Sequence, residues 1–341
     1  MKKICAAIMA DNVPFYQGDI LEYVYGSERL QEIRVVADLF PERITSLNID
    51  KLLSELKDVE AIFSCWGMLS LTEEQLDKMP NLKIVFYASG SVVGFSQLLM
   101  KRGIAICSAV DANAIPVAEF CLAQIILACK RAHTNSQLCN SGPWKQQDMP
   151  VGKGVYGETV ALLGIGAISR HLIKLLKSLN LRIIAVSGYL AKDPAKAKEM
   201  GIDKLVTTEE AFSTAYVVSN HLPDKSTNKG VLQERHFSSM REGATFINTG
   251  RGAQVDELGL IKVLKSRFDL TALLDVQFPE PPIEGSELYT LKNVHMTSHI
   301  AGSINDEVRR MADFMISDFK RWAAVEQLLY AVDAKEMGGR A

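Results

Sequence analysis

Short apolar runs alternate with amphipathic stretches along the first third of the chain. The stretches between the apolar runs, such as IDKLLSELKD and TEEQLDKM, space their apolar residues as helices with one buried face do. Runs that are apolar throughout and alternate with helices are typical of a parallel sheet covered on both faces. The predicted strands are KICAAIM (3–9), RVVADL (34–39), AIFSCW (61–66), KIVFYAS (83–89) and IAICSAV (104–110).

A second series with the same alternation follows. Its predicted strands are TVALLGIG (159–166), LRIIAVSG (181–188), AYVVSNHLP (215–223), ATFINTG (244–250), LTALLDV (270–276) and NVHMTSH (293–299). Two series of this kind predict the α/β class, with two doubly wound parallel-sheet domains.

Two long helices are expected to join the series. One begins near Pro116, because proline suits the first helical turn, and ends near Asn140; the other spans about 304–324. The second helix is expected to return the chain to the first domain. That domain would then combine 1–111 with 304–341, around a central domain of 112–303.

Composition narrows the classes of function. A length of 341 residues suits two domains, and a net charge of −2 shows no basic excess, so no nucleic-acid partner is expected. The most apolar long segment, 116–129, is interrupted by Glu119 and Gln124, so no membrane span is expected. The six cysteines form no C-x-x-C pair, which predicts neither a metal site nor a disulfide framework. Together these features favour a cytoplasmic protein.

A glycine turn opens the second series. VALLGIGAIS (160–169) precedes a helical run and a further strand. Gly164 permits a tight turn, and Gly166 lets the backbone approach a pyrophosphate at the helix N-terminus. Ser169 replaces the third glycine of the pattern, and serine is small enough to keep the helix close to the strand. The strand–turn–helix–strand context makes dinucleotide binding the favoured interpretation over a purely structural turn.

The end of the next strand departs from the usual pattern. An acid there normally binds the ribose hydroxyls of NAD, whereas this chain has Ser187. Serine is neutral, so the feature that excludes a 2′-phosphate is missing. The cofactor is therefore expected to be NAD or NADP, without a decision between them.

Three later strands are each associated with a side chain that could take part in catalysis. Arg251 lies between two glycines in FINTGRG, Glu280 lies in the loop after LLDV, and His299 ends the last strand. Each alone has an ordinary structural explanation, but the combination suits hydride transfer to a 2-oxo acid. Histidine exchanges the hydroxyl proton, a carboxylate orients it, and arginine binds the substrate carboxylate at two points.

The same segments resemble the D-isomer-specific 2-hydroxyacid dehydrogenases over nearly the whole chain. The resemblance rests on NAIPVAEF (113–120), LLGIGAIS (162–169), NHLPDKST (220–227), INTGRGAQVDE (247–257), LDVQFPEP (274–281) and SHIAGS (298–303). ASGSVVGF (88–95) further resembles a phosphoglycerate dehydrogenase-like branch. The resemblance implies a central Rossmann domain, a discontinuous flavodoxin-like substrate domain without a regulatory domain, and a homodimer. Arg251, Glu280 and His299 would be catalytic.

Further positions follow from the resemblance. The cofactor would be met by Gly164, Gly166, Ala167, Ile168, Ser187, Leu222, Thr249, Gly250, Asp275 and Gly302, with Asp275 facing the nicotinamide amide. The substrate would be met by Arg251 and by two loops whose backbone amides bind its carboxylate, at Trp66, Gly67, Ser89, Gly90 and Ser91.

Two functions stay open at this point. The first is a dehydrogenase that moves a hydride between a nicotinamide cofactor and C2 of a small 2-hydroxy or 2-oxo acid, such as phosphoglycerate, glyoxylate or hydroxypyruvate. The alternative is a non-catalytic protein of the same superfamily that senses NAD(H). A turnover assay separates them.

Overall fold

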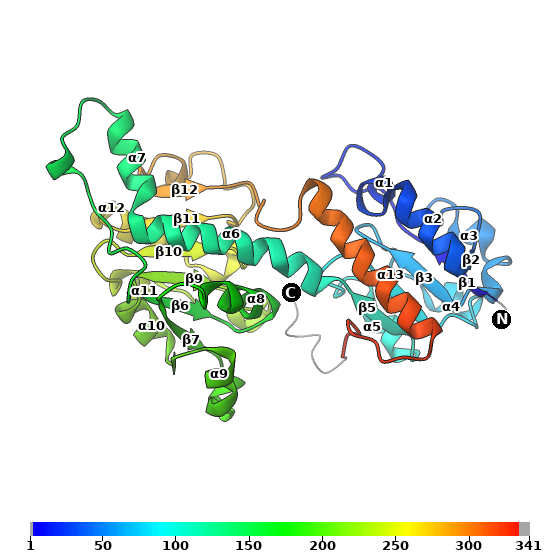
Figure 1. Ribbon diagram of the computed structural model, residues 1–341. Coiled ribbons are helices and arrows are strands. Elements are labelled where there is room, and N and C mark those ends of the chain that lie inside the picture. The colour runs from blue at the N-terminus through cyan, green and yellow to red at the C-terminus, as the bar shows by residue number, and fades with distance from the viewer. Residues whose placement is uncertain (1–2, 334–341) are drawn as a thin grey trace. The chain divides into compact units, whose positions relative to one another are not determined.

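The computed structural model describes residues 3–333 and divides the chain into two compact units (Figure 1). The first unit holds the residues up to Asn113 and those from Ser303 onward, and the second holds Ala114–Gly302. The first unit is thus built from both ends of the chain.

The first unit contains a parallel sheet with the strand order β2-β1-β3-β4-β5 within the described residues. This 2-1-3-4-5 order is the flavodoxin-like one. The strands are β1 (Ile4–Ile8), β2 (Ala37–Leu39), β3 (Ala61–Ser64), β4 (Ile84–Tyr87) and β5 (Ala105–Ser108).

Alternate residues of these strands enter two separate apolar cores. Ala6 and Phe63 face a cluster with the first helices and the last one, whereas Ala7 and Ile62 face a cluster with the helices between β2 and β5. The sheet is therefore covered on both faces, as continuous apolar strands predict. The first group of helices is α1 (Ile20–Val24), α2 (Gly26–Val36) and α13 (Arg309–Ala323); the second is α3 (Ile49–Leu52), α4 (Glu73–Asp77) and α5 (Ser96–Lys101).

The second unit contains a parallel sheet with the order β12-β11-β10-β9-β6-β7-β8 within the described residues. Counted from β6, this is the doubly wound Rossmann order, and the winding reverses between β6 and β9. The strands are β6 (Thr159–Leu163), β7 (Arg182–Val186), β8 (Lys204–Leu205), β9 (Val217–Asn220), β10 (Thr245–Asn248), β11 (Thr271–Leu274) and β12 (Val294–Met296).

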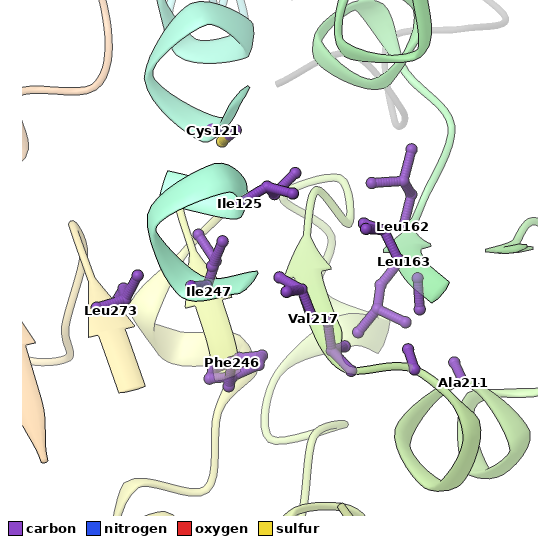
Figure 2. Packing of buried hydrophobic residues seen from close by; sticks show 14 of the residues in the cluster. Cys121, Ile125, Leu162, Leu163, Ala211, Val217, Phe246, Ile247 and Leu273 are labelled. Carbon is purple, nitrogen blue, oxygen red and sulfur yellow. The ribbon is translucent and has the colours of Figure 1, made fainter. Parts of the chain in front are cut away.

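Helices cover this sheet, and one apolar cluster joins them to it. Figure 2 shows Cys121 and Ile125 on α6 (Val110–Lys130), with Ile125 directed toward the strands that carry Leu162 and Val217. Further helices of this unit are α8 (Ala167–Leu176), α9 (Pro194–Met200), α10 (Thr208–Thr214), α11 (Glu234–Ser238) and α12 (Glu257–Ser266).

The long helix at Pro116 differs from its prediction. α6 begins at Val110, so Pro116 lies inside the helix rather than in its first turn. The chain then turns at Arg131, whose φ of 54° is left-handed, and continues as α7 (Ala132–Asn140). α6 is long and apolar enough to span a membrane by length and composition alone, and half of that apolar stretch is buried inside the protein.

Two further segments differ from the expected pattern. RVVADL was expected to be a strand throughout, but its first residues end α2 and only Ala37–Leu39 forms β2. β-branched residues favour strands, yet here Val35 and Val36 continue the helix that buries Ile33 in the core. IDKLLSELKD forms α3 and a separate 3₁₀ turn (Leu56–Asp58) instead of one helix.

Candidate active site

The turn between β6 and α8 has the geometry of a dinucleotide-binding turn. Gly164 has a φ of +87°, and a Cβ there would lie 2.6 Å from the carbonyl oxygen of His221, so only glycine fits. A Cβ on Gly166 would meet no atom within 4 Å, which leaves room at the N-terminus of α8. Ser169 is buried and its Oγ donates to the Gly164 carbonyl at 2.7 Å. Serine at the third position of the glycine pattern therefore stabilises the turn with a hydrogen bond.

This turn lies where the winding of the sheet reverses, which is the usual place for a ligand in such folds. Ala167 and Ile168 begin α8, whose first backbone amides can meet a pyrophosphate. Leu222 follows β9, and Thr249 and Gly250 follow β10, the strand next to β9. The residues present thus fit a dinucleotide.

Thr249 is buried in a short polar chain. Its Oγ1 lies 3.3 Å from the Cys121 Sγ and 3.5 Å from the His221 Nδ1, and the His221 Nε2 lies 2.9 Å from the Ser219 Oγ. Burial lowers the pKa of His221 to about 4, so this ring is neutral at physiological pH. Sequence reasoning did not single out this chain of side chains.

Ser187 follows β7, where the acid of NAD-selective folds normally lies. Its Oγ accepts a hydrogen bond of 3.4 Å from the Leu190 amide. The next turn is 3₁₀ (Leu190–Lys192) and presents the exposed Lys192. A positively charged side chain thus follows Ser187 closely in the sequence.

His299 and Glu280 form the one hydrogen-bonded acid–base pair that the catalytic prediction requires. The His299 Nδ1 lies 2.7 Å from the Glu280 Oε1, and the two side chains are 51% and 38% exposed. Because Nδ1 is engaged by the carboxylate, the ring is oriented and Nε2 can exchange a proton with a ligand. His299 has a φ of 59°, which is uncommon for a residue other than glycine.

Asp275 holds the turn that carries His299. Its Oδ1 accepts from the Ile300 amide at 2.9 Å and from the Thr297 Oγ1 at 2.6 Å, and its Oδ2 accepts from the Ala301 amide at 2.9 Å. Its carbonyl accepts from the His299 amide at 3.0 Å. The side chain is 2% exposed. Both carboxylate oxygens are thus engaged in shaping the turn that ends at Gly302, and the expected contact with the nicotinamide amide stays a prediction.

Arg251 lies in the turn after β10, beside the loop that carries Glu280. A Cβ on Gly252 would lie 2.0 Å from the carbonyl of Gln277, and the Gln277 amide donates to the Glu280 Oε2 at 3.4 Å. The Arg251 Nε donates to the Asp224 Oδ2 at 3.2 Å, and its Nη1 donates to the Gly250 carbonyl at 2.8 Å. The structure therefore joins the loops of Arg251, Glu280 and His299 within the second unit.

The predicted substrate loops lie in the first unit, after β3 and β4. Gly67 has a φ of +89° and packs so tightly that a Cβ would lie 2.1 Å from the Asp11 carbonyl oxygen. In the other loop, the Ser108 Oγ donates to the carbonyls of Ser89 and Gly90 at 3.0 and 2.6 Å. Both loops, which include Trp66 and Ser91, are thus held in place by their own unit.

One of the backbone amides expected to bind the substrate is already used. The Ser89 amide donates to the Tyr87 carbonyl at 2.8 Å. Within residues 3–333, the amides of Gly90 and Ser91 show no such bond, so they are the better candidates for a carboxylate.

Comparison with known proteins decides the family. The model of the D-isomer specific 2-hydroxyacid dehydrogenase NAD-binding domain matches residues 122–301, more than half of the chain. The chain belongs to this family. It is therefore an NAD(P)-dependent oxidoreductase of the CH–OH group, and the match covers the glycine turn, Arg251, Glu280 and His299 together.

Individual relatives of this 2-hydroxyacid dehydrogenase are distant. A glyoxylate reductase of Thermococcus litoralis is 28% identical over 81% of this chain and 84% of the relative. A D-3-phosphoglycerate dehydrogenase of Archaeoglobus fulgidus is 27% identical over 77% of this chain and 49% of the relative, so the chain spans about half of that protein. A phosphoglycerate oxidoreductase structure from Rhizobium etli has a TM-score of 0.80 and 19% identity, over 100% of this chain and 98% of that one, which supports the fold.

The dehydrogenase also contains polar residues near Arg251 that the sequence reasoning missed. They are Asp224, which contacts the guanidinium, and three buried amides, Asn220, Asn248 and Gln254. A signal was present, since Asn220 and Asn248 end the apolar strands β9 and β10, and Asp224 and Gln254 lie in the segments NHLPD and INTGRGAQ that continue from them. Polar residues directly after buried strands of one sheet are expected to meet at its carboxyl edge.

Proposed function

We propose that this dehydrogenase reduces a small 2-oxo acid at C2, or oxidises the corresponding 2-hydroxy acid, with Arg251, Glu280 and His299 in the roles given above. The observation that carries the proposal is the 2.7 Å contact between the His299 Nδ1 and the Glu280 Oε1, in a loop that touches the Arg251 turn. A hydroxy-acid reaction needs these three groups on one edge.

When bound, the nicotinamide cofactor supplies or accepts the hydride, and the chain's own residues handle the proton and the anion. During reduction, the His299 Nε2 would donate a proton to the C2 oxygen, and during oxidation it would take that proton back. Glu280 stabilises the protonated ring and fixes its orientation. The Arg251 guanidinium would bind the substrate carboxylate and polarise the C2 oxygen.

The substrate class is tested with a panel of 2-oxo acids. Glyoxylate, hydroxypyruvate, phosphohydroxypyruvate and pyruvate are each offered with NADH and with NADPH, and absorbance at the nicotinamide band reports turnover. We expect steady turnover of at least one of them. Tight binding of NADH without turnover of any member would instead support the alternative, a protein that senses the cofactor.

Cofactor choice gives a sharper prediction. Ser187 cannot repel a 2′-phosphate, and Lys192 follows in the next turn, so we expect the parent to discriminate less than about tenfold in kcat/KM, or about 1.4 kcal/mol. Ser187→Asp should shift the preference toward NADH by adding repulsion. The measurement is kcat/KM with both reduced cofactors. A parent that already prefers NADH a hundredfold would contradict the prediction.

We also propose a homodimer. The family resemblance implies one, and the segment from α6 onward exposes large apolar side chains, including Leu127 at 39%, Leu138 at 44% and Trp144 at 52%. An interface with a second copy would remove these apolar side chains from water. We expect light scattering to give twice the monomer mass at micromolar concentration. A monomer throughout that range would refute the dimer.

A further inference from the structure

Three buried amide side chains lie beneath the Arg251 turn. Asn220, Asn248 and Gln254 are 0%, 1% and 2% exposed, and they bond to one another. The Asn220 Nδ2 donates to the Asn248 Oδ1 at 3.0 Å and to the Gln254 Oε1 at 2.8 Å. Buried amides without partners are costly, so a cluster that satisfies itself has one strongly preferred arrangement. We call these three residues the amide cluster.

The amide cluster fixes the loop after β9. The Gln254 Nε2 donates to the carbonyls of Leu222 and Pro223, each at 3.0 Å. The Asn220 Oδ1 accepts from the Leu222 amide at 3.2 Å. These bonds hold the backbone up to the residue before Asp224. The amide cluster therefore fixes the position of Asp224.

The same cluster fixes the turn after β10. The Asn248 Oδ1 accepts from the Gly250 amide at 3.1 Å, and the Asn248 Nδ2 donates to the Arg251 carbonyl at 3.4 Å. A Cβ on Gly250 would lie 3.0 Å from the side-chain atoms of Asn220 and Gln254, so this turn lies directly on the cluster. Asp224 and Arg251 are therefore placed by one set of buried hydrogen bonds.

The guanidinium of Arg251 is then held at two of its three nitrogens. Nε donates to the Asp224 Oδ2 at 3.2 Å and Nη1 donates to the Gly250 carbonyl at 2.8 Å. For Nη2, the part of the chain that the structure describes offers no hydrogen-bond partner. The group is thus oriented before any ligand arrives, with its Nη2 side available to an anion.

We propose that Asp224, placed by Gln254 and the amide cluster, is a positioning residue that presets the Arg251 guanidinium for the anionic substrate. The inference rests on the proposed role of Arg251 and adds the residues that orient it. Preset donors need no reorganisation when the substrate binds, so orientation raises both affinity and turnover.

The opposite role would make Asp224 a competitor of the substrate carboxylate. Two observations favour positioning. Asp224 contacts Nε through one oxygen and leaves Nη2 available. Its loop could not withdraw from Arg251 without breaking the two Gln254 bonds to Leu222 and Pro223. The two roles differ in sign, because loss of a competitor would lower KM, whereas loss of a positioning group raises it.

The test compares Asp224→Asn with the parent and with Asp224→Glu. We expect Asp224→Asn to lower kcat/KM for the preferred 2-oxo acid about two- to fivefold, the range that a half-exposed ion pair accounts for. Asp224→Glu keeps the charge and should recover most of the loss. Glu199→Gln on α9 is the matched control, because it removes an exposed charge from the same unit, and it should leave kcat/KM unchanged.

A double-mutant cycle separates positioning from general weakening of the fold. In an Arg251→Ala background, Asp224→Asn should have almost no further effect, because the group that it orients is gone. Gln254→Leu should lower kcat/KM more than Asp224→Asn does, since it frees the loop and removes the acceptor of one Asn220 Nδ2 hydrogen. The Kd for NADH and the melting temperature are measured for every variant, and Asp224→Asn should change neither.

Oxalate binding keeps the inference testable even if no 2-oxo acid is reduced. Oxalate carries the carboxylate that Arg251 would bind, and calorimetry in the presence of NADH gives its Kd without catalysis. A rise in this Kd on Asp224→Asn that disappears in the Arg251→Ala background supports positioning. An unchanged or lower Kd, or equal effects in both backgrounds, overturns it. Absence of turnover in the parent would count against the proposed function alone.

Discussion

His299→Gln is expected to lower kcat by about two to four decades, the usual contribution of a general acid–base group. Glutamine has a similar size and its amide nitrogen can still donate a hydrogen bond to the Glu280 carboxylate, so the loop should keep its shape. It cannot supply or take up a proton at the position of Nε2. The loss should therefore fall on kcat, while the Kd for NADH stays near the parent value. Stopped-flow kinetics of a single turnover would place the loss in the chemical step.

The matched control is His133→Gln on α7, a half-buried histidine outside the site. It should leave kcat close to the parent value. Glu280→Gln should retain more activity than His299→Gln, because it weakens the orientation and the charge stabilisation of the ring but leaves the ring in place. Near-normal turnover in the His299 variant would remove His299 from the mechanism.

The sequence predicted the sheets and the catalytic edge because both depend on short-range patterns. Continuous apolar strands such as TVALLGIG can only be buried on both faces, and a parallel sheet follows from that. Parallel strands of one sheet end on the same edge. Residues that follow successive strands, such as Arg251 and His299, are therefore predicted to lie on one edge of the sheet.

The ends of helices and the hydrogen-bond partners of polar groups were harder to predict from the sequence. Pro116 suggested a helix start, but the chain before it is helical, and burial of Ala112 and Ala114 favours one continuous helix. Proline lacks the amide that would bond to the Ala112 carbonyl, and tertiary packing offsets that loss. Local propensity does not contain this packing, so the sequence could not reveal where α6 begins.

The role of Asp275 shows the same limit at the site. The family resemblance of LDVQFPEP implied that its side chain faces the nicotinamide amide. Which group its carboxylate meets depends on the path of the turn at 297–301, where the amides of Ile300 and Ala301 point back at it. Such long-range hydrogen bonds follow no periodicity in the sequence. The sequence can therefore place Asp275 near the carboxyl edge of the sheet, but only the structure shows which groups its carboxylate bonds to. The contact between Asp224 and Arg251 was missed for the same reason.

Arg251→Lys is the second prediction with a large effect. Lysine keeps the positive charge, but its single ammonium nitrogen cannot bond to the Asp224 carboxylate, the Gly250 carbonyl and a substrate in the planar arrangement of a guanidinium. We expect kcat/KM to fall by about two decades, or about 2.7 kcal/mol, shared between a higher KM and a lower kcat. The shared loss follows because the group binds the carboxylate in the ground state and polarises the C2 oxygen in the transition state. Arg182→Lys on β7, an exposed arginine of the same unit, is the control and should behave as the parent. If KM and kcat of the Arg251 variant both stay at the parent values, Arg251 does not hold the carboxylate.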